Sequence, residues 1–273
     1  MQYDPIKRSL GRVFNKTPFL RKLFYKLLDV LLLRSWYVRK ELKKWVARKA
    51  GSSADLNILD AGCGFGQYTY FLSGLRLKKN ILAVDLKEEQ VADCNAFFSR
   101  IKRSGVLFEK ADLTAFSKND FFDLILSVDV MEHITEDEKV FVNFFNSLKQ
   151  GGMLLISTPS DLGGSDVHDH DHGESFIDEH VREGYNFTDI QEKLRRAGFS
   201  HTEACYTYGR PGQIGWRLSM KYPILMLNAS KILFVVLPFY YLLAFPFALI
   251  FNYVDLHNTH KRGTGLVVKA FKE

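Results

Sequence analysis

The chain has 273 residues and a formal net charge of +6, with 47% hydrophobic and 25% charged residues. This composition excludes a disordered or fibrous protein, and the length suffices for one buried core with accessory segments. The three cysteines, Cys63, Cys94 and Cys205, are scattered and form no C-x-x-C pair. Their pattern argues against a disulfide framework or a zinc site and favours a reducing cytosol.

The positive charge is concentrated near the N-terminus. Residues 1–50 contain 14 Lys or Arg and 3 Asp or Glu, so the rest of the chain is net acidic. The spacing of Leu and Phe over 13–50 predicts one or two helices with basic borders. Two interpretations remain open: a helix packed on the domain with a solvated basic face, or an interfacial helix on anionic lipid. The polar residues 1–10 do not predict a signal peptide.

Strands and helices alternate from residue 56 onwards. We predict helices at 66–77 and 87–103, and two more that begin at capping boxes, Thr135 with Glu138 and Thr188 with Gln191. Gly151 and Gly152 are expected to end the first of these. Seven strands are predicted, at 56–60, 80–85, 106–110, 121–129, 153–158, 199–208 and 264–272. The alternation predicts an α/β fold, a parallel sheet with helices on both faces.

Residues 57–67 combine a strand end with a glycine-rich turn, reading NILDAGCGFGQ. Such a turn lets backbone N–H groups approach a ligand beyond the carboxyl ends of the strands. Asp85 ends the next strand, where a carboxylate can accept both hydroxyls of a ribose. The spacing is G-x-G-x-G rather than the dinucleotide pattern G-x-G-x-x-G, because Gln67 stands where the third glycine belongs. Asp60 would repel a pyrophosphate and favour a cationic ligand such as S-adenosylmethionine.

Five segments in chain order resemble the motifs of class I S-adenosylmethionine-dependent methyltransferases. They are ILDAGCGFG (58–66), AVD (83–85), KADL (110–113), DLILSVDVMEH (123–133) and KQGGMLLISTP (149–159). The resemblance implies a Rossmann-like, doubly wound seven-stranded sheet. Together with the composition of the flanking segments, it divides the chain into a basic amphipathic helical arm (1–50), a methyltransferase domain (51–208 and 259–273) and a hydrophobic, membrane-associating helical insertion before the last strand (209–258).

The resemblance also implies how the cofactor is bound. The glycine-rich loop would pack under its methionine part, Asp60 near its ammonium, Asp85 on its ribose and Asp112 on its adenine amino group. Leu86 and Leu113 would sandwich the adenine ring, and residues 127–129 would flank the sulfonium. The full cofactor set is Asp60, Gly62, Cys63, Gly64, Gly66, Gln67, Asp85, Leu86, Ala111, Asp112, Leu113, Ser127, Val128 and Asp129.

Methyl transfer requires an aligned acceptor and a site closed to water. An oxygen acceptor must also lose its proton, which a neutral His can remove. His133 follows the fourth strand and is the first candidate, although it could simply cap the following helix. Asp129, Glu132 and His133 resemble the acidic-plus-His pattern of ubiquinone-pathway O-methyltransferases, which is implicated in divalent-metal dependence. Asp replaces Glu at the first position, so we predict no metal and keep this set as the alternative.

A second cluster, at 166–180, alternates His and Asp after the fifth strand, where the resemblance implies a substrate-covering loop. Such a cluster could ligate a metal. We predict instead a lid whose His170, His172 or His180 faces the acceptor or solvent, and we name His170 and His172 as catalytic candidates beside His133.

Residues 232–251 carry no charge and are long enough to span a bilayer. A single crossing would separate the sixth and seventh strands, which the resemblance pairs in one sheet. Pro238 and Pro246 therefore predict helices that bend and return on the same side, or lie in the interface. A fully buried hydrophobic hairpin is the alternative.

Together these features predict a cytoplasmic enzyme attached peripherally or monotopically to the cytoplasmic membrane face. It would methylate a hydrophobic acceptor (a lipid, quinone or isoprenoid-like molecule) and release S-adenosylhomocysteine. One alternative is a methyltransferase of nucleic acid or protein recruited by the basic arm. It is disfavoured because no Asn/Asp-Pro-Pro-Tyr/Phe signature follows the fourth strand. A non-enzymatic binding module is disfavoured by the three intact carboxylates. The sequence does not identify the acceptor, the methylated atom or the oligomeric state.

Overall fold

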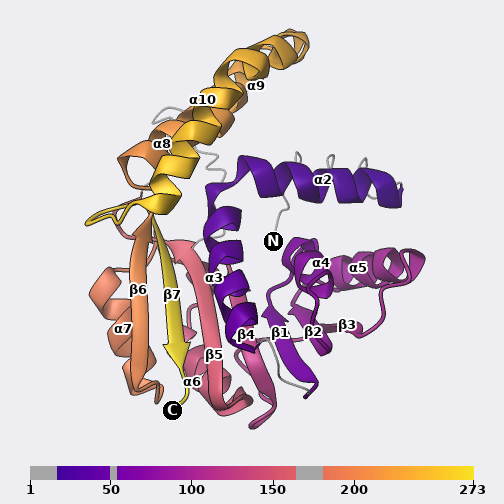
Figure 1. The fold of residues 1–273 in the computed structure, drawn as a ribbon, viewed down its shortest axis with the longest axis vertical. Coiled ribbons are helices and arrows are strands. Elements are labelled where there is room, and N and C mark those ends of the chain that lie inside the picture. The colour runs from indigo at the N-terminus through magenta and orange to yellow at the C-terminus, as the bar shows by residue number, and fades with distance from the viewer. Residues whose placement is uncertain (1–16, 50–53, 164–180) are drawn as a thin grey trace.

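The computed structural model describes residues 17–49, 54–163 and 181–273 (Figure 1). Its core is a single seven-stranded sheet in the order β3-β2-β1-β4-β5-β7-β6. Strand β7 runs antiparallel to both of its neighbours, β5 and β6, and the other pairings are parallel. The α/β, Rossmann-like fold predicted from the sequence is confirmed. The strands are β1 (Leu56–Ala61), β2 (Lys79–Asp85), β3 (Val106–Lys110), β4 (Phe122–Val128), β5 (Leu148–Pro159), β6 (His201–Thr207) and β7 (Gly265–Phe271).

Helices cover both faces of the sheet because successive strand residues point to opposite sides. On β1, Ile58 packs in the cluster of helix α3 (Leu33–Lys49), whereas Leu59 packs in that of helix α6 (Asp137–Ser147). Both residues are completely buried. The first face carries α3 (Leu33–Lys49), α4 (Gln67–Ser73) and α5 (Glu88–Arg100), and the second carries α6 (Asp137–Ser147) and α7 (Phe187–Arg196).

The two predicted capping boxes are wrong. Helix α6 is preceded by Glu136 rather than Thr135, and no side chain caps it. Helix α7 is capped by Asn186, whose side-chain oxygen accepts from the N–H groups of Thr188 and Asp189 at 3.0 and 3.4 Å. Asn caps a helix N-terminus at least as well as Thr, so Asn186 and Thr188 were both N-cap candidates in the sequence.

The glycine pair at 151–152 does not end α6. The helix stops at Ser147 and β5 begins directly at Leu148, so both glycines lie within the bounds of the strand. The pairing between β4 and β5 shifts register there, and Gly151 has a φ of +73°. A left-handed residue at an irregular strand position is a natural place for glycine.

The N-terminal arm consists of α2 (Pro18–Leu31) and α3. Thr17 caps α2 by accepting from the N–H of Leu20 at 3.2 Å, and the extended Leu32 separates the two helices. In Figure 1, α3 lies along the sheet, and α2 turns away from it and is drawn above α4 and α5. The arm is therefore folded onto the domain.

The insertion forms a helical hairpin between β6 and β7. The chain runs outward through α8 (Arg210–Trp216), the π-helix η2 (Arg217–Lys221) and α9 (Tyr222–Ala229), turns through the 3-10 helix η3 (Lys231–Val235), and returns along α10 (Leu237–His257). The chain thus bends at 230–236 and not at the prolines. Pro238 lies in the first turn of α10, where proline needs no N–H partner, and Pro246 lies inside α10 without ending it.

The hairpin is anchored at its base and projects at its tip (Figure 1). At the base, the Tyr37 hydroxyl donates to Asp255 Oδ1 at 2.8 Å, and Lys40 Nζ donates to the Leu256 carbonyl at 2.7 Å. Within the described ranges, α10 is the one helix long and apolar enough to cross a membrane. Only 11% of its most apolar 18-residue stretch is buried.

Candidate active site

The glycine-rich loop joins β1 to α4 through three left-handed residues, Gly62, Gly64 and Gly66, with φ values of +80°, +50° and +75°. A Cβ atom at Gly62 would lie 2.3 Å from Val130 Cγ2, so no larger residue fits there. The N–H groups of Gly62 and the buried Cys63 both donate to the Val84 carbonyl at 2.9 Å. The loop is thereby held against the end of β2.

Two of the three predicted cofactor carboxylates flank this loop. Asp60 is 2% exposed and accepts a hydrogen bond from Thr69 Oγ1 at 2.5 Å, and burial raises its pKa to about 6. Asp85 is half-buried, and its two oxygens accept from the N–H groups of Gly64 and Lys87, each at 2.9 Å. The structure therefore brings both Asp60 and Asp85 next to the turn.

The third carboxylate, Asp112, follows β3. It is exposed, and its Oδ1 accepts from Thr114 N and Thr114 Oγ1 at 2.9 and 2.8 Å, which lowers its pKa. Ala111 donates its N–H to the Asp85 carbonyl at 3.1 Å and links this turn to β2. Of the two predicted adenine contacts, Leu113 is buried whereas Leu86 is 52% exposed. One wall of the predicted adenine position is thus in the core and the other is open.

The end of β4 combines an unsatisfied hydroxyl with an unusual backbone. Ser127 is fully buried, and its Oγ has no hydrogen-bond partner among the described atoms. Val128 is half-buried, and Asp129 has a φ of +52°, a conformation that non-glycine residues adopt rarely and often at functional sites. The Asp129 side chain forms an ion pair with Arg34 of the arm.

The arm supplies a wall of this site that the sequence did not predict. The Arg34 N–H donates to the Tyr208 hydroxyl at 3.0 Å, and Tyr208 also has a left-handed φ of +53°. The predicted loop residue Gln67 donates from Nε2 to Asp29 Oδ1 at 2.8 Å and to Ser35 Oγ at 3.2 Å. Nothing in the basic run distinguishes Arg34 from its neighbours, because its role depends on residues far along the chain.

The first catalytic candidate, His133, lies in the 3-10 helix η1 (Met131–His133) and is exposed. Its neighbour Glu132 is 1% exposed and accepts from Thr158 Oγ1 at 3.1 Å, and burial raises the pKa of Glu132. Since Asp129 pairs with Arg34, the alternative metal set is not gathered. Among the described residues no three His, Cys, Asp or Glu side chains form a metal-binding group.

The other two catalytic candidates, His170 and His172, lie outside the described residues, as does His180. The first described residue after them is Val181, whose N–H donates to the Glu132 carbonyl at 3.1 Å. Arg182 then pairs with the buried Asp137, which also accepts from the Tyr185 hydroxyl at 2.7 Å. The residues that follow the predicted lid are thus fixed beside η1.

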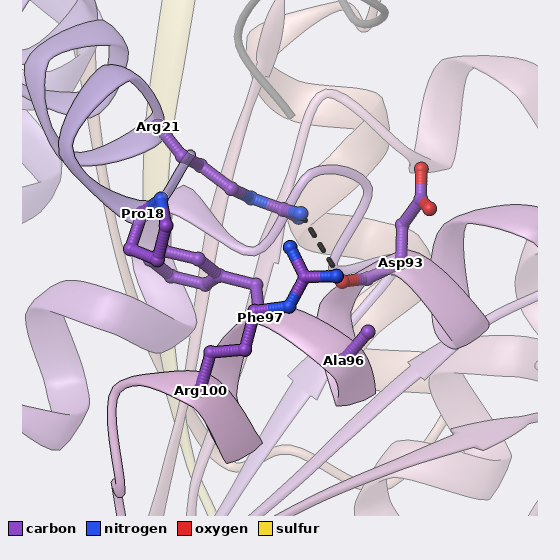
Figure 2. Close-up of a pocket in the computed structure, with 6 residues that line it drawn as sticks. All are labelled: Pro18, Arg21, Asp93, Ala96, Phe97 and Arg100. Carbon is purple, nitrogen blue, oxygen red and sulfur yellow. Dashed lines mark hydrogen bonds between the residues drawn. The ribbon is translucent and has the colours of Figure 1, made fainter. Parts of the chain in front are cut away.

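A pocket between α2 and α5 lies apart from these residues (Figure 2). It is lined by Pro18, Arg21, Asp93, Ala96, Phe97 and Arg100, and none of these belongs to the predicted cofactor set. Arg21 crosses it and donates from Nη1 to the Asp93 carbonyl at 3.1 Å (Figure 2). The pocket marks the contact between the arm and α5.

Known proteins similar in sequence to this chain are named as methyltransferases. Phosphoethanolamine N-methyltransferase 1 of Zea mays is 29% identical over 60% of this chain and 32% of its own length. Malonyl-[acyl-carrier protein] O-methyltransferase of Bacillus anthracis is 30% identical over 41% of this chain and 40% of its own. These alignments therefore span about a third to two fifths of the relatives.

A solved structure shows the same fold. Phosphoethanolamine N-methyltransferase 2 of Haemonchus contortus, in complex with S-adenosylmethionine, superposes with a TM-score of 0.59 at 18% identity, covering 85% of this chain and 52% of that one. A family model described as a methyltransferase domain matches residues 52–197, more than half of the chain. The predicted family and cofactor are thereby confirmed, and the chain belongs to the class I S-adenosylmethionine-dependent methyltransferases.

Proposed function

We propose that this enzyme methylates a hydrophobic small molecule, such as a lipid, quinone or isoprenoid-like compound, at a membrane surface. The observation that carries the proposal is the apolar surface of the α9–α10 hairpin. Seven side chains there are at least 60% exposed: Ile232, Phe234, Val235, Phe239, Leu242, Leu243 and Phe247. Apolar patches of this kind mark sites of interaction with membranes or proteins.

The topology favours attachment on one side of a bilayer. Strands β6 and β7 pair up to Thr207 and Gly265, so the hairpin leaves and rejoins the sheet at one point. In Figure 1 it projects from the same end of the molecule as the α2 helix, beyond the carboxyl ends of the parallel strands. An acceptor drawn from the bilayer would thus reach the cofactor end of the sheet.

The proposed chemistry is an in-line displacement. The acceptor atom would bond to the methyl carbon through its own lone pair as the carbon–sulfur bond breaks. The electron pair of the broken bond would stay on sulfur, which gives S-adenosylhomocysteine. In this proposal Asp60, Asp85 and Asp112 hold the cofactor. An oxygen acceptor gives its proton to a histidine, with His133 first, and His170 and His172 as the lid candidates.

The relatives' names do not specify a hydrophobic acceptor, since they give phosphoethanolamine and malonyl-[acyl-carrier protein]. The contacts of the arm nevertheless weaken the nucleic-acid or protein alternative. Arg21, Arg34 and Arg39 form buried or half-buried contacts within the molecule, so they do not add to an open cationic surface. The three free cysteines support the cytoplasmic face as the location.

The proposal is tested by incubating the purified enzyme with vesicles made from a membrane lipid extract and with methyl-labelled S-adenosylmethionine. We expect label in the organic phase, on a molecule that mass spectrometry then identifies. Label confined to added nucleic acid or protein, or a protein that is detergent-independent and does not sediment with anionic vesicles, would contradict the proposal. Self-association of the hairpin, measured by sedimentation, would instead indicate a second copy of the chain as its partner.

A further inference from the structure

Helix α2 has two faces with different surroundings. Arg21 and Tyr25, one turn apart, are 3% and 1% exposed and face the domain. Phe19, Leu23 and Leu27 follow one another at four-residue spacing and are 73%, 39% and 43% exposed. At 100° per residue, this second row lies on the opposite side of the helix. The helix therefore contacts the domain with Arg21 and Tyr25 and presents an apolar row to its exterior.

The inner face of α2 holds the glycine-rich loop. Phe65 lies between Gly64 and Gly66, and its carbonyl accepts from Arg21 Nη2 at 2.9 Å and from the Tyr25 hydroxyl. Arg21 Nε also donates to the Tyr25 oxygen at 2.8 Å, so the two side chains brace each other. Two donors from one helix thus fix one carbonyl in the middle of the predicted cofactor loop.

Further along the arm, the same placement is fixed twice more. Asp29, near the end of α2, accepts from Gln67 at the start of α4, and Arg34 pairs with Asp129 at the end of β4. Any shift of α2 relative to the domain would strain or break these contacts. The geometry of the cofactor site therefore depends on the position of α2.

The outer face of α2 fits an anionic bilayer. Its apolar row is bordered by Lys22 and Lys26, both exposed, and an apolar helix face with Lys at its border is typical of helices that lie in the interface of anionic membranes. The helix also lies at the end of the molecule from which the hairpin projects (Figure 1). A bilayer that receives the hairpin would be available to this face.

We propose that α2 couples membrane binding to cofactor binding, with Arg21 as the positioning residue that connects the outer face to the loop. The inference rests on the membrane attachment proposed above. The bilayer and the cofactor both favour the placement of α2 that orders the loop, so each raises the affinity for the other by the same factor. The enzyme would thus bind its cofactor best where its acceptor is.

The coupling is measured with S-adenosylhomocysteine, which cannot donate a methyl group. Its Kd is determined by calorimetry without vesicles, with phosphatidylcholine vesicles, and with vesicles that also contain phosphatidylglycerol. We expect binding about fivefold tighter or more with the anionic vesicles, the lower end of typical couplings. In the double variant Leu23→Ser/Leu27→Ser, the Kd in solution stays the same and the enhancement is lost.

Arg21→Ala should weaken the binding of S-adenosylhomocysteine in solution and abolish its enhancement by anionic vesicles. The variant protein should still sediment with vesicles, because its hairpin is unchanged. Arg21→Lys keeps one donor and should restore part of both effects, which general destabilisation would not do. The matched control is Lys22→Ala, an exposed neighbour, which leaves the Kd in solution unchanged. A melting curve of each variant confirms that it is folded.

Two results overturn the inference and separate it from the proposed function. If the protein sediments with anionic vesicles but its Kd changes by less than about twofold, α2 does not couple the two events, and the membrane proposal stands. If the protein does not sediment with vesicles, the coupling and the membrane attachment fail together.

Discussion

The N-terminal arm and the α9–α10 hairpin are the two accessory regions of this methyltransferase, and their burial is the reverse of what composition suggests. The arm is strongly basic, yet Arg21 is buried and Arg34 and Arg39 are paired with carboxylates. The hairpin is strongly apolar, yet only 11% of the most apolar 18-residue stretch of α10 is buried.

The difference shows which interactions decide the position of each region. An arginine can enter the interior when carbonyl and carboxylate oxygens are already placed to receive its donors, as the Phe65 carbonyl is for Arg21. The apolar side chains at the hairpin tip stay exposed instead. The arm is therefore held at the cofactor end by directed polar contacts. The hairpin tip, by contrast, has no packing partner within the described residues.

The largest expected effect is at His133, which belongs to neither region. If this exposed histidine is the base for an oxygen acceptor, His133→Ala lowers kcat by about 100-fold or more and leaves the Kd of S-adenosylhomocysteine unchanged. Steady-state kinetics and calorimetry measure the two quantities. The matched control is His201→Ala, at the exposed start of β6. Equal losses of turnover and cofactor affinity would show that His133 serves the cofactor site instead.

At the cofactor end, Asp85→Ala should weaken S-adenosylmethionine binding by roughly 100-fold, since it removes charge-assisted hydrogen bonds worth about 2–3 kcal/mol together. It also frees the N–H of Gly64, which Asp85 accepts at 2.9 Å. Calorimetry measures the loss, and Glu88→Ala, whose side chain is 77% exposed, is the control. Vesicle binding should not change. Unaltered cofactor affinity would remove Asp85 from the site.

The hairpin should show the opposite pattern. Phe239 and Leu242 are 69% and 74% exposed, so Phe239→Ser/Leu242→Ser should leave the melting temperature and cofactor affinity unchanged. If both side chains enter the bilayer in part, losing about 2 kcal/mol of burial weakens vesicle binding roughly thirtyfold in sedimentation assays. Leu107→Ser, at a 52% exposed position on β3, is the control. A large drop in melting temperature would indicate that the hairpin is buried.

The smallest effect concerns pH and Asp60. Burial raises the pKa of this carboxyl from 3.8 to about 6, so the folded protein binds more protons than the unfolded chain between these values. The free energy of unfolding of the ligand-free protein should therefore rise as pH falls through this window. Cofactor affinity should move the other way, about tenfold weaker at pH 5 than at pH 7, because the cofactor ammonium needs the ionised form.

Asp60→Asn should flatten both profiles, measured by chemical denaturation and calorimetry, without altering vesicle binding. A cofactor affinity that falls from pH 5 to pH 7 in the unmodified protein would contradict the assigned role of Asp60.

The sheet was predictable because its strands carry their own signal. Central strands such as β1 and β4 are buried on both faces and read as short apolar runs ending in polar residues. The helix starts were less predictable, since Asn186 and Thr188 are both capping residues and only the three-dimensional structure selects between them.

The arm side of the site could not be predicted at all. Arg21 is buried against a carbonyl 44 residues later in the chain, and the half-buried Arg34 pairs with a carboxylate 95 residues later. Neither partner is visible in the local pattern. The loop residues and Asp85, by contrast, follow from turn chemistry and strand order, and the structure brings them together as expected. Their roles in binding, and those of His133, His170 and His172, stay predictions.

The pairing of Thr207 with Gly265 makes the hairpin a replaceable module. Its two ends meet at adjacent positions of one antiparallel ladder, which a short turn could close as well as a long insertion. The cut has to spare the base, where Asp255 receives the Gly212 N–H at 2.9 Å and the Tyr37 hydroxyl. If the hairpin is the membrane anchor proposed above, shortening only the part beyond residue 216 and before residue 248 should remove membrane attachment and leave the cofactor site in place.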